Sequence, residues 1–345
     1  MLLREHPERR AVSNEVHSRP YPTLRAPEQV SHLAILSGEA AAAEDRATLA
    51  RLCALLGCDP PAEGTTFFAA SAGTLRLRWE RHTEFSTFTF MRPLGEEEEP
   101  FAAPAIQAVP QTWMESLPPK ILVAVHAALL EAPPDWAGQG LPAAVGRYFA
   151  SDNVAGSLVA GGMAAAWTDF VIHEDGFGRV LVMDRGLRER QAGRLVQRLL
   201  EIETYRTMAL LGFPVARELA PQLSRLDRTL TETSSRIATL ADIEGERTLL
   251  ATLTRHAAEI ERLINASVYR FGASRAYYAL VERRIAELRE QRIEGLQTIA
   301  EFMERRLAPA MRTCEATAAR LEALAQRVGR ASNLLRTPVD IELEA

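Results

Sequence analysis

The sequence predicts an α+β protein, with an N-terminal mixed α/β sheet domain followed by a long antiparallel, coiled-coil-like helical region. Between Val30 and Gly186, short apolar runs and period-two alternation give the pattern of strands with interspersed helices. After Gly186 no strand pattern occurs, and apolar residues keep helical spacing nearly to the end. We therefore expect an extended segment over residues 1–30, the sheet domain over 31–186 and the helical region over 187–345.

The sheet domain is predicted to begin with a strand followed by a helix. Residues 30–38 have the composition of a short buried strand, and residues 39–57 carry a leucine face that ends at Gly57. Residues 65–73 predict a second strand. The alternation over residues 74–93 then predicts a β-hairpin.

The first strand of this hairpin has one apolar face and one mostly charged face. Leu75, Leu77 and Trp79 share the apolar side, because successive side chains of a strand alternate between faces. The opposite side carries Arg76, Arg78, Glu80 and His82. Arg81 breaks the pattern by following Trp79 onto the apolar face, so a charged group is expected next to the core.

The rest of the sheet domain is predicted to form further strands. Residues 120–130 form an apolar run that fits either a strand or a buried helix. Residues 153–162, 165–176 and 178–186 are better strands, and the Asp175–Gly176 step is typical of the turn between the last two.

Three helices are expected to follow. The first covers residues 188–212 and stops near Pro214, and the second follows Pro221. The third ends at Gly272, a candidate C-cap, with Ser274 as the next N-cap. This pattern predicts a helical hairpin.

The last helix is predicted over Arg275 to Leu335. Its apolar seam repeats every eleven residues, about 3.67 per turn, which favours a nearly straight helix with a slight right-handed supercoil and not a leucine zipper. One helix of this length would measure on the order of 90 Å. Pro309 lies inside it, so two stacked helices are an open alternative.

Composition excludes several classes of protein. A net charge of -5 and a pI near 5.9 leave no basic footprint for nucleic acid. Three cysteines are too few for a disulfide framework, and Cys53 and Cys58 have the wrong spacing for a zinc knuckle. No signal peptide is apparent, and the longest apolar window, residues 154–167, is too short to cross a bilayer. We expect a soluble chain in a reducing, cytoplasmic compartment.

The candidate site combines a proline-rich loop with the end of the hairpin strand. The loop SNEVHSRPYPTLRAP, residues 13–27, holds polar groups between prolines that restrict φ. If it folds over the strand end, imidazoles, carboxylates and guanidiniums converge. The ligand-binding candidates are Asn14, Glu15, His17, Arg19, Glu80, Arg81, His82 and Glu84.

This set allows two kinds of ligand. His17 and His82 with a carboxylate could bind a divalent metal, and a histidine could act as general acid or base. Arg19 and Arg81 could instead bind an anion.

A structural interpretation competes with both, and we favour it. Glu15 and Glu84 would pair with arginines and pin the N-terminal segment across the sheet edge, because ion-pair networks use the same residue types as binding sites. No GxSxG, HExxH or Walker sequence supplies a recognisable catalytic motif.

Several long stretches together resemble the bacterial family catalogued as domain of unknown function 3422. They are NEVHSRP, RWERHTEFSTF, LEIETYRTMALLGFPVARE, RFGASRAYYALVERRIAELREQRIEGLQTIAEFMERRLAPAMRTCEA and ASNLLRTPVD, and the resemblance covers nearly the whole chain. It implies a membrane-anchored protein without an established enzymatic activity. Similar members continue past LLRTPVD into a hydrophobic C-terminal segment. The resemblance therefore implies a soluble chain at the cytoplasmic face of the inner membrane, attached through an anchor that this chain lacks.

Three functions follow as hypotheses. The first is a cytoplasmic scaffold or sensor that assembles into a homo-oligomer through its long helices, without catalytic turnover. The second is a metal-assisted hydrolase using His17, His82 and Glu80 or Glu84. The third is a cation-sensing domain, by a fold-level analogy with the cytoplasmic part of CorA-type magnesium channels. The sequence leaves the cofactor open, and a divalent cation fits the last two hypotheses.

Overall fold

The computed structural model describes residues 5–15, 19–95, 98–133, 136, 142–151, 153–237 and 243–343. The chain divides into two compact units. We call the first, Met1–Thr204 with Glu282–Phe302, the sheet unit. The second, Tyr205–Val281 with Met303–Ala345, is the helical unit.

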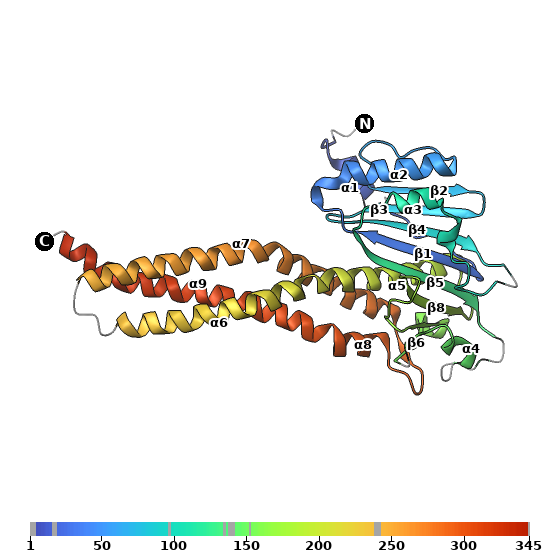
Figure 1. Cartoon of the computed structure of the whole chain (residues 1–345). Coiled ribbons are helices and arrows are strands. Elements are labelled where there is room, and N and C mark those ends of the chain that lie inside the picture. The colour runs from blue at the N-terminus through green and yellow to red at the C-terminus, as the bar shows by residue number, and fades with distance from the viewer. Residues whose placement is uncertain are drawn as a thin grey trace. The chain divides into compact units, whose positions relative to one another are not determined.

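One mixed sheet organises the sheet unit (Figure 1). Among the described residues its strand order is β2-β3-β4-β1-β5-β8-β7-β6-β9. All neighbours are antiparallel except β5 and β8, which confirms the predicted mixed α/β sheet. The strands are β1 Glu28–Ile35, β2 Phe67–Ala72, β3 Leu75–Arg81, β4 Ser86–Pro93, β5 Ile121–Glu131, β6 Ala155–Val159, β7 Ala164–Thr168, β8 Gly178–Asp184 and β9 Gln291–Arg292.

Helix α1, Arg9–Glu15, precedes the first strand. The helices between strands are α2 Ala42–Leu56, α3 Gln111–Glu115 and α4 Ala143–Gly146, with 3-10 turns at Glu39–Ala41, Ala105–Ala108 and Ala160–Gly162. Gly57 ends α2 in the left-handed region at φ 70°, as predicted. The ambiguous run at 120–130 is a strand. Helix α1 and the β9 strand were not among the predicted elements.

The face of the sheet that α2 covers holds the main core. Leu75, Leu77 and Trp79 are buried there, so the predicted alternation of β3 is confirmed. Trp113 of α3 packs edge-on against Phe88 with ring centroids 5.0 Å apart, and its indole N–H donates to the backbone of α2. Burying these large side chains is the main stabilisation of this layer.

The opposite face is covered by α5, Glu189–Leu210, whose residues up to Thr204 belong to the sheet unit. His32 of β1 points to this side, with Nδ1 2.8 Å from the Thr89 hydroxyl and Nε2 3.2 Å from the Thr204 hydroxyl. Burial lowers the pKa of His32 to about 4, so its ring is neutral at physiological pH.

The last strand comes from far along the chain. β9 pairs with β6 through Ser157 and Leu158. Beside it, a carboxylate oxygen of Glu290 accepts a hydrogen bond from the Ser157 hydroxyl at 2.5 Å. The same carboxylate accepts from the backbone N–H groups of Ile299 and Ala300, which open α8. The half-buried Glu290 therefore joins the edge of the sheet to the start of α8.

Three long helices form the helical unit: α6 Gly212–Ile237, most of α7 Ile243–Leu288, and α9 Ala308–Leu343, while α8 Ile299–Arg306 precedes α9. Asp227 of α6 pairs with Arg320 and Arg327 of α9. Arg225 of α6 pairs with Glu259 of α7 at 2.7 Å. Since Gly212 at the start of α6 lies next to Ser274 and Cys314, α6 runs parallel to α9 and antiparallel to α7.

Several predicted helix limits are wrong. α6 includes Pro214 in its first turn, where a backbone N–H has no helical acceptor, and continues through Pro221 because the leucines around it stay buried. α7 continues through Gly272 and Ser274, so the predicted helical hairpin is absent there.

The predicted 275–335 helix is also wrong. α7 ends at Leu288, where Arg289 takes a φ of 51°, and α9 starts next to Pro309, a position that tolerates proline. Arg292, which lies inside the predicted helix, is exposed in β9. Most buried positions of α9 are spaced alternately by four and three, against the predicted eleven-residue period: Ala310, Cys314, Thr317, Leu321, Leu324, Val328, Ala331 and Leu335. Ala308 and Met311, near the start of the helix, are buried as well.

Candidate functional site

Residues 19–28, which we call the strap, are held along the charged face of β3. The Arg19 guanidinium donates to the Arg81 carbonyl at 3.3 Å. Arg78 donates to the Pro20 carbonyl, and Arg76 donates to the Thr23 carbonyl at 2.7 Å. The segment is therefore held by arginine-to-carbonyl hydrogen bonds, which the sequence interpretation did not include.

The predicted site residues are only partly brought together. His17 lies outside the described residues, and Asn14 and Glu15 are described by their backbone in α1 alone. The ion pair predicted for Glu15 and the metal site predicted for His17 therefore stay predictions. Arg19 and the four candidates from the hairpin, Glu80, Arg81, His82 and Glu84, lie near the end of β3.

Arg81 is a structural residue. It is 5% exposed, as expected from its place on the apolar face. Its guanidinium donates to the carbonyls of Phe85 at 2.8 Å and Gly38 at 2.5 Å, and its Nε lies 3.3 Å from the Asp45 carboxylate. Because these contacts occupy the guanidinium, Arg81 is poorly placed to bind an anion.

His82 lies in a positive environment. Its ring stacks on Phe85 with centroids 4.3 Å apart. Burial first, and then the charges of Arg19, Arg81 and Arg78, lower its pKa to about 3. The ring is therefore neutral near pH 7 and cannot donate as a general acid there, and the same field opposes a divalent cation.

Glu80 is already engaged, since its carboxylate accepts from Arg78 Nε at 2.7 Å. Within the described parts of the chain, no three His, Cys, Asp or Glu side chains lie close enough together to hold a metal ion. These contacts favour a structural role for this end of β3.

A cleft that the sequence did not indicate lies at the other end of the strap. Its volume is about 610 Å³, and its walls come from the strap, the β2–β3 turn, the ends of β4 and β5, and the first residue of α5. A smaller cavity of about 400 Å³ adjoins it and shares Leu24, Arg25, Ala26, Glu131 and Glu189. A cleft of this size can hold a small molecule.

The cleft carries more acidic than basic side chains. Glu28 is 3% exposed and bonds Arg76 and the Arg25 backbone N–H, yet burial raises its pKa overall, and Glu189 adds to the increase. The carboxylates of Glu131 and Glu189 are exposed and have no ion pair or hydrogen bond among the described contacts. The cleft can therefore offer free negative charge to a cationic group.

No sequence motif marked this cleft because its acidic residues come from separate segments. Glu28 starts β1, Glu131 ends β5, and Glu189 starts α5. Only the parallel pairing of β5 with β8, which leads directly into α5, brings the last two together.

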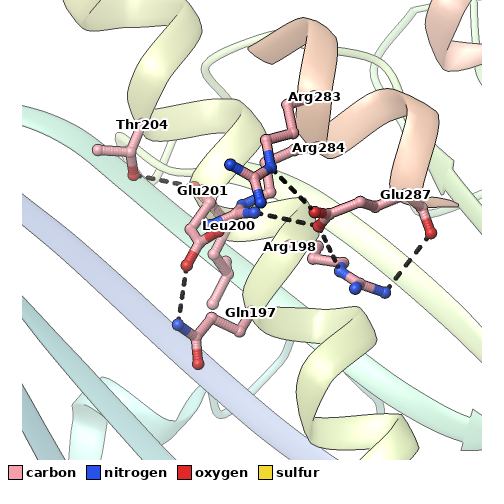
Figure 2. Close-up of polar contacts among 8 residues, drawn as sticks. All are labelled: Gln197, Arg198, Leu200, Glu201, Thr204, Arg283, Arg284 and Glu287. Atoms are coloured by element: carbon pink, nitrogen blue, oxygen red, sulfur yellow. Dashed lines mark hydrogen bonds and ion pairs between the residues drawn. The ribbon is translucent and has the colours of Figure 1, made fainter. Parts of the chain in front are cut away.

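Further along, α5 is clamped to the end of α7 (Figure 2). Arg198 Nε lies 3.0 Å from Glu287, and Arg284 bridges Glu287 at 3.0 Å and Glu201. Burial of Glu287 opposes ionisation, but Arg284 and Arg198 outweigh it and lower its pKa overall. Gln197 also donates to Glu201 at 2.8 Å. All of these residues belong to the sheet unit.

Together these features define a two-unit protein with a mixed sheet, a solvent cleft at the start of α5 and a helical unit made of three long helices. The chain belongs to the family described as a protein of unknown function (DUF3422), which matches residues 4–345. Neither the comparison with curated proteins nor that with solved structures gave a match. In the described part of the chain, no helix is both long and apolar enough to cross a membrane.

Proposed function

We propose that this chain is a sensor and scaffold domain of a membrane-anchored bacterial protein, and that its sheet unit binds a cationic ligand. The observation that carries the proposal is the cleft of about 610 Å³ with the free carboxylates of Glu131 and Glu189 in its wall. Anchoring and the cytoplasmic location rest on the family resemblance. The proposal unites the scaffold hypothesis with the cation-sensing one.

Helix α5 supplies the route for a signal. Glu189 lines the cleft, and Gly193, one turn on, contacts the strap backbone at Pro22. Arg198 and Thr204 then bind the end of α7 and His32 of the sheet. A ligand that moves the first turn of α5 therefore strains contacts along the whole helix, which continues to Leu210 in the helical unit.

The charge distribution supports this proposal over the hydrolase. The end of β3 is positive and its ionisable side chains are engaged, whereas the cleft is lined by three glutamates and two arginines, and Glu131 and Glu189 keep free carboxylates. Glu131 and Glu189 do not form a compact metal cluster with a third ligand, so we expect an organic amine to bind more tightly than a metal ion.

Ligand binding is tested by thermal unfolding followed by tryptophan fluorescence. Spermidine, putrescine, Mg²⁺ and Ca²⁺ are the cationic probes, and phosphate and a nucleotide are the anionic ones. We expect the amines to stabilise the wild type, and Glu131→Gln and Glu189→Gln to abolish the effect. Glu174→Gln, an exposed carboxylate in the β7–β8 connection, is the matched control and should keep it.

Two results would contradict the proposal. One is the absence of stabilisation by any cationic probe, and the other is stabilisation that survives in the Glu131→Gln/Glu189→Gln double variant. Hydrogen exchange adds a test of the signal route: amine binding should change exchange of the amides in residues 189–204 more than those of α2.

A further inference from the structure

The strand β2 lies at one end of the sheet (Figure 1). Within the described residues, β2 has one strand neighbour, β3, and the opposite edge is the two-residue β9. The sequence of β2 is FFAASA, and its pairing with β3 shows no register shift. It thus lacks the lysine, proline, charge or bulge with which soluble proteins usually protect an edge strand.

The hydrogen-bonding direction along β2 follows from one contact. The Arg81 backbone N–H donates to the Thr66 carbonyl at 2.8 Å, in register with the β2–β3 ladder. Because hydrogen-bonded and non-hydrogen-bonded pairs alternate in an antiparallel ladder, the N–H and C=O groups of Phe67, Ala69 and Ser71 must point away from β3. Ala69 and Ser71 are also exposed.

We propose that β2 pairs with β2 of a second copy of this chain, antiparallel about a two-fold axis at Ala69. In that register Ala69 faces its own copy, and Phe67 faces Ser71 on each side. These are the residues whose backbone groups point outward, so about six main-chain hydrogen bonds form without moving the strand. The two sheets then continue as one across the dimer.

The charges near the edge allow this pairing. No side chain of β2 is charged, so none meets a like charge at the two-fold axis. One strand inward, Arg78 is neutralised by Glu80 at 2.7 Å, and Arg76 by Glu28. A foreign peptide could use the same backbone groups. We infer a second copy of this chain as the partner, because its β2 strand pairs in a two-fold symmetric register. This pairing is independent of the ligand proposed for the cleft.

Sedimentation equilibrium of the 345-residue chain tests the pairing, over about 5 to 200 µM because association follows mass action. We expect a monomer–dimer equilibrium that Ala69→Lys weakens by about tenfold or more, since two ammonium groups then meet at the axis. Ala69→Pro removes the outward N–H and should weaken it as well. Ala319→Lys, the same substitution on the exposed side of α9, is the control and should associate like the wild type.

Amide exchange gives a residue-level readout. Exchange of Phe67, Ala69 and Ser71 should slow as the concentration rises, whereas Phe68, Ala70 and Ala72 should be protected at every concentration. The proposal is overturned if the chain stays monomeric, or if it dimerises while Ala69→Lys associates as the wild type does. Should Ala69→Pro fail to fold, Ala69→Lys and the exchange pattern decide.

Discussion

Substituting Gly193 by alanine should destabilise the sheet unit, although alanine is normally the better helix former. A Cβ at this position would lie 1.7 Å from the Pro22 carbonyl oxygen and 2.7 Å from its carbonyl carbon. Carbon–oxygen contacts need about 3.3 Å, so the strap would have to retreat by roughly 1.5 Å. Such a shift would break the hydrogen bond from the Leu24 N–H to the Glu189 carbonyl, now 3.1 Å.

The magnitude follows from three contributions. Overpacking costs about 1–3 kcal/mol. Loss of the backbone hydrogen bond costs about 0.5–1.5 kcal/mol. Replacing glycine in a helix returns about 1 kcal/mol. The net expectation for Gly193→Ala is a loss of about 2 kcal/mol in the unfolding free energy of the sheet unit.

Urea unfolding followed by tryptophan fluorescence measures this loss, because all four tryptophans, at positions 79, 113, 136 and 167, belong to the sheet unit. Gly329→Ala in α9 is the control: a Cβ there meets nothing within 4 Å, so helix stability followed by circular dichroism should rise by up to about 1 kcal/mol. If Gly193→Ala stabilises the sheet unit to a similar extent, the strap does not pack tightly against α5, and α5 is not the signal route proposed above.

Three further outcomes are expected. Because the pKa of His32 is depressed to about 4 in the folded state, the unfolded state takes up the proton first, and the contribution of His32 to stability should fall by up to about 3 kcal/mol as pH drops from about 6.5 to 4; fluorescence-monitored urea unfolding at several pH values, repeated on His32→Gln, should show a dependence shallower by this amount in the variant. Glu287→Gln removes the carboxylate that pairs with Arg198, Arg283 and Arg284, of which Arg284 keeps Glu201, and should cost about 1–2 kcal/mol, less in high salt, whereas Glu282→Gln on the exposed side of α7 should be neutral. Glu290→Ala should speed amide exchange at the start of α8 and in β6, and unchanged exchange there would contradict its role at the sheet edge.

The strands could be predicted from the sequence because the pattern that marks a strand is local. Alternation of side chains along β3 is a property of neighbouring residues, and the misplaced Arg81 could be recognised against it. The helix ends were less readable. Gly272 and Pro221 are signals of helix termination, but packing on both sides of each residue keeps the helix intact, and a sequence window does not contain that packing.

The candidate site was predictable only in part. The sequence suggested that the loop folds over the end of β3, and the structure shows Arg76 and Arg78 of β3 bound to the strap. These arginines donate to backbone carbonyls. Because every residue has a carbonyl, no sequence motif shows which one is bound. The cleft was missed because its carboxylates meet through the parallel β5–β8 pairing, a long-range contact.

The origin of β9 has a consequence for synthesis of the protein. The ribosome completes β8 about a hundred residues before β9 emerges, a delay on the order of ten seconds at about 5–20 residues per second. During that interval the backbone of β6 has no partner on one side, and Ser157 lacks the carboxylate of Glu290. In a truncated chain that ends after β8, strand β6 would stay unpaired on this side. Any shortened version meant to fold alone should therefore carry residues 282–302, rejoined by a linker in place of the helical unit.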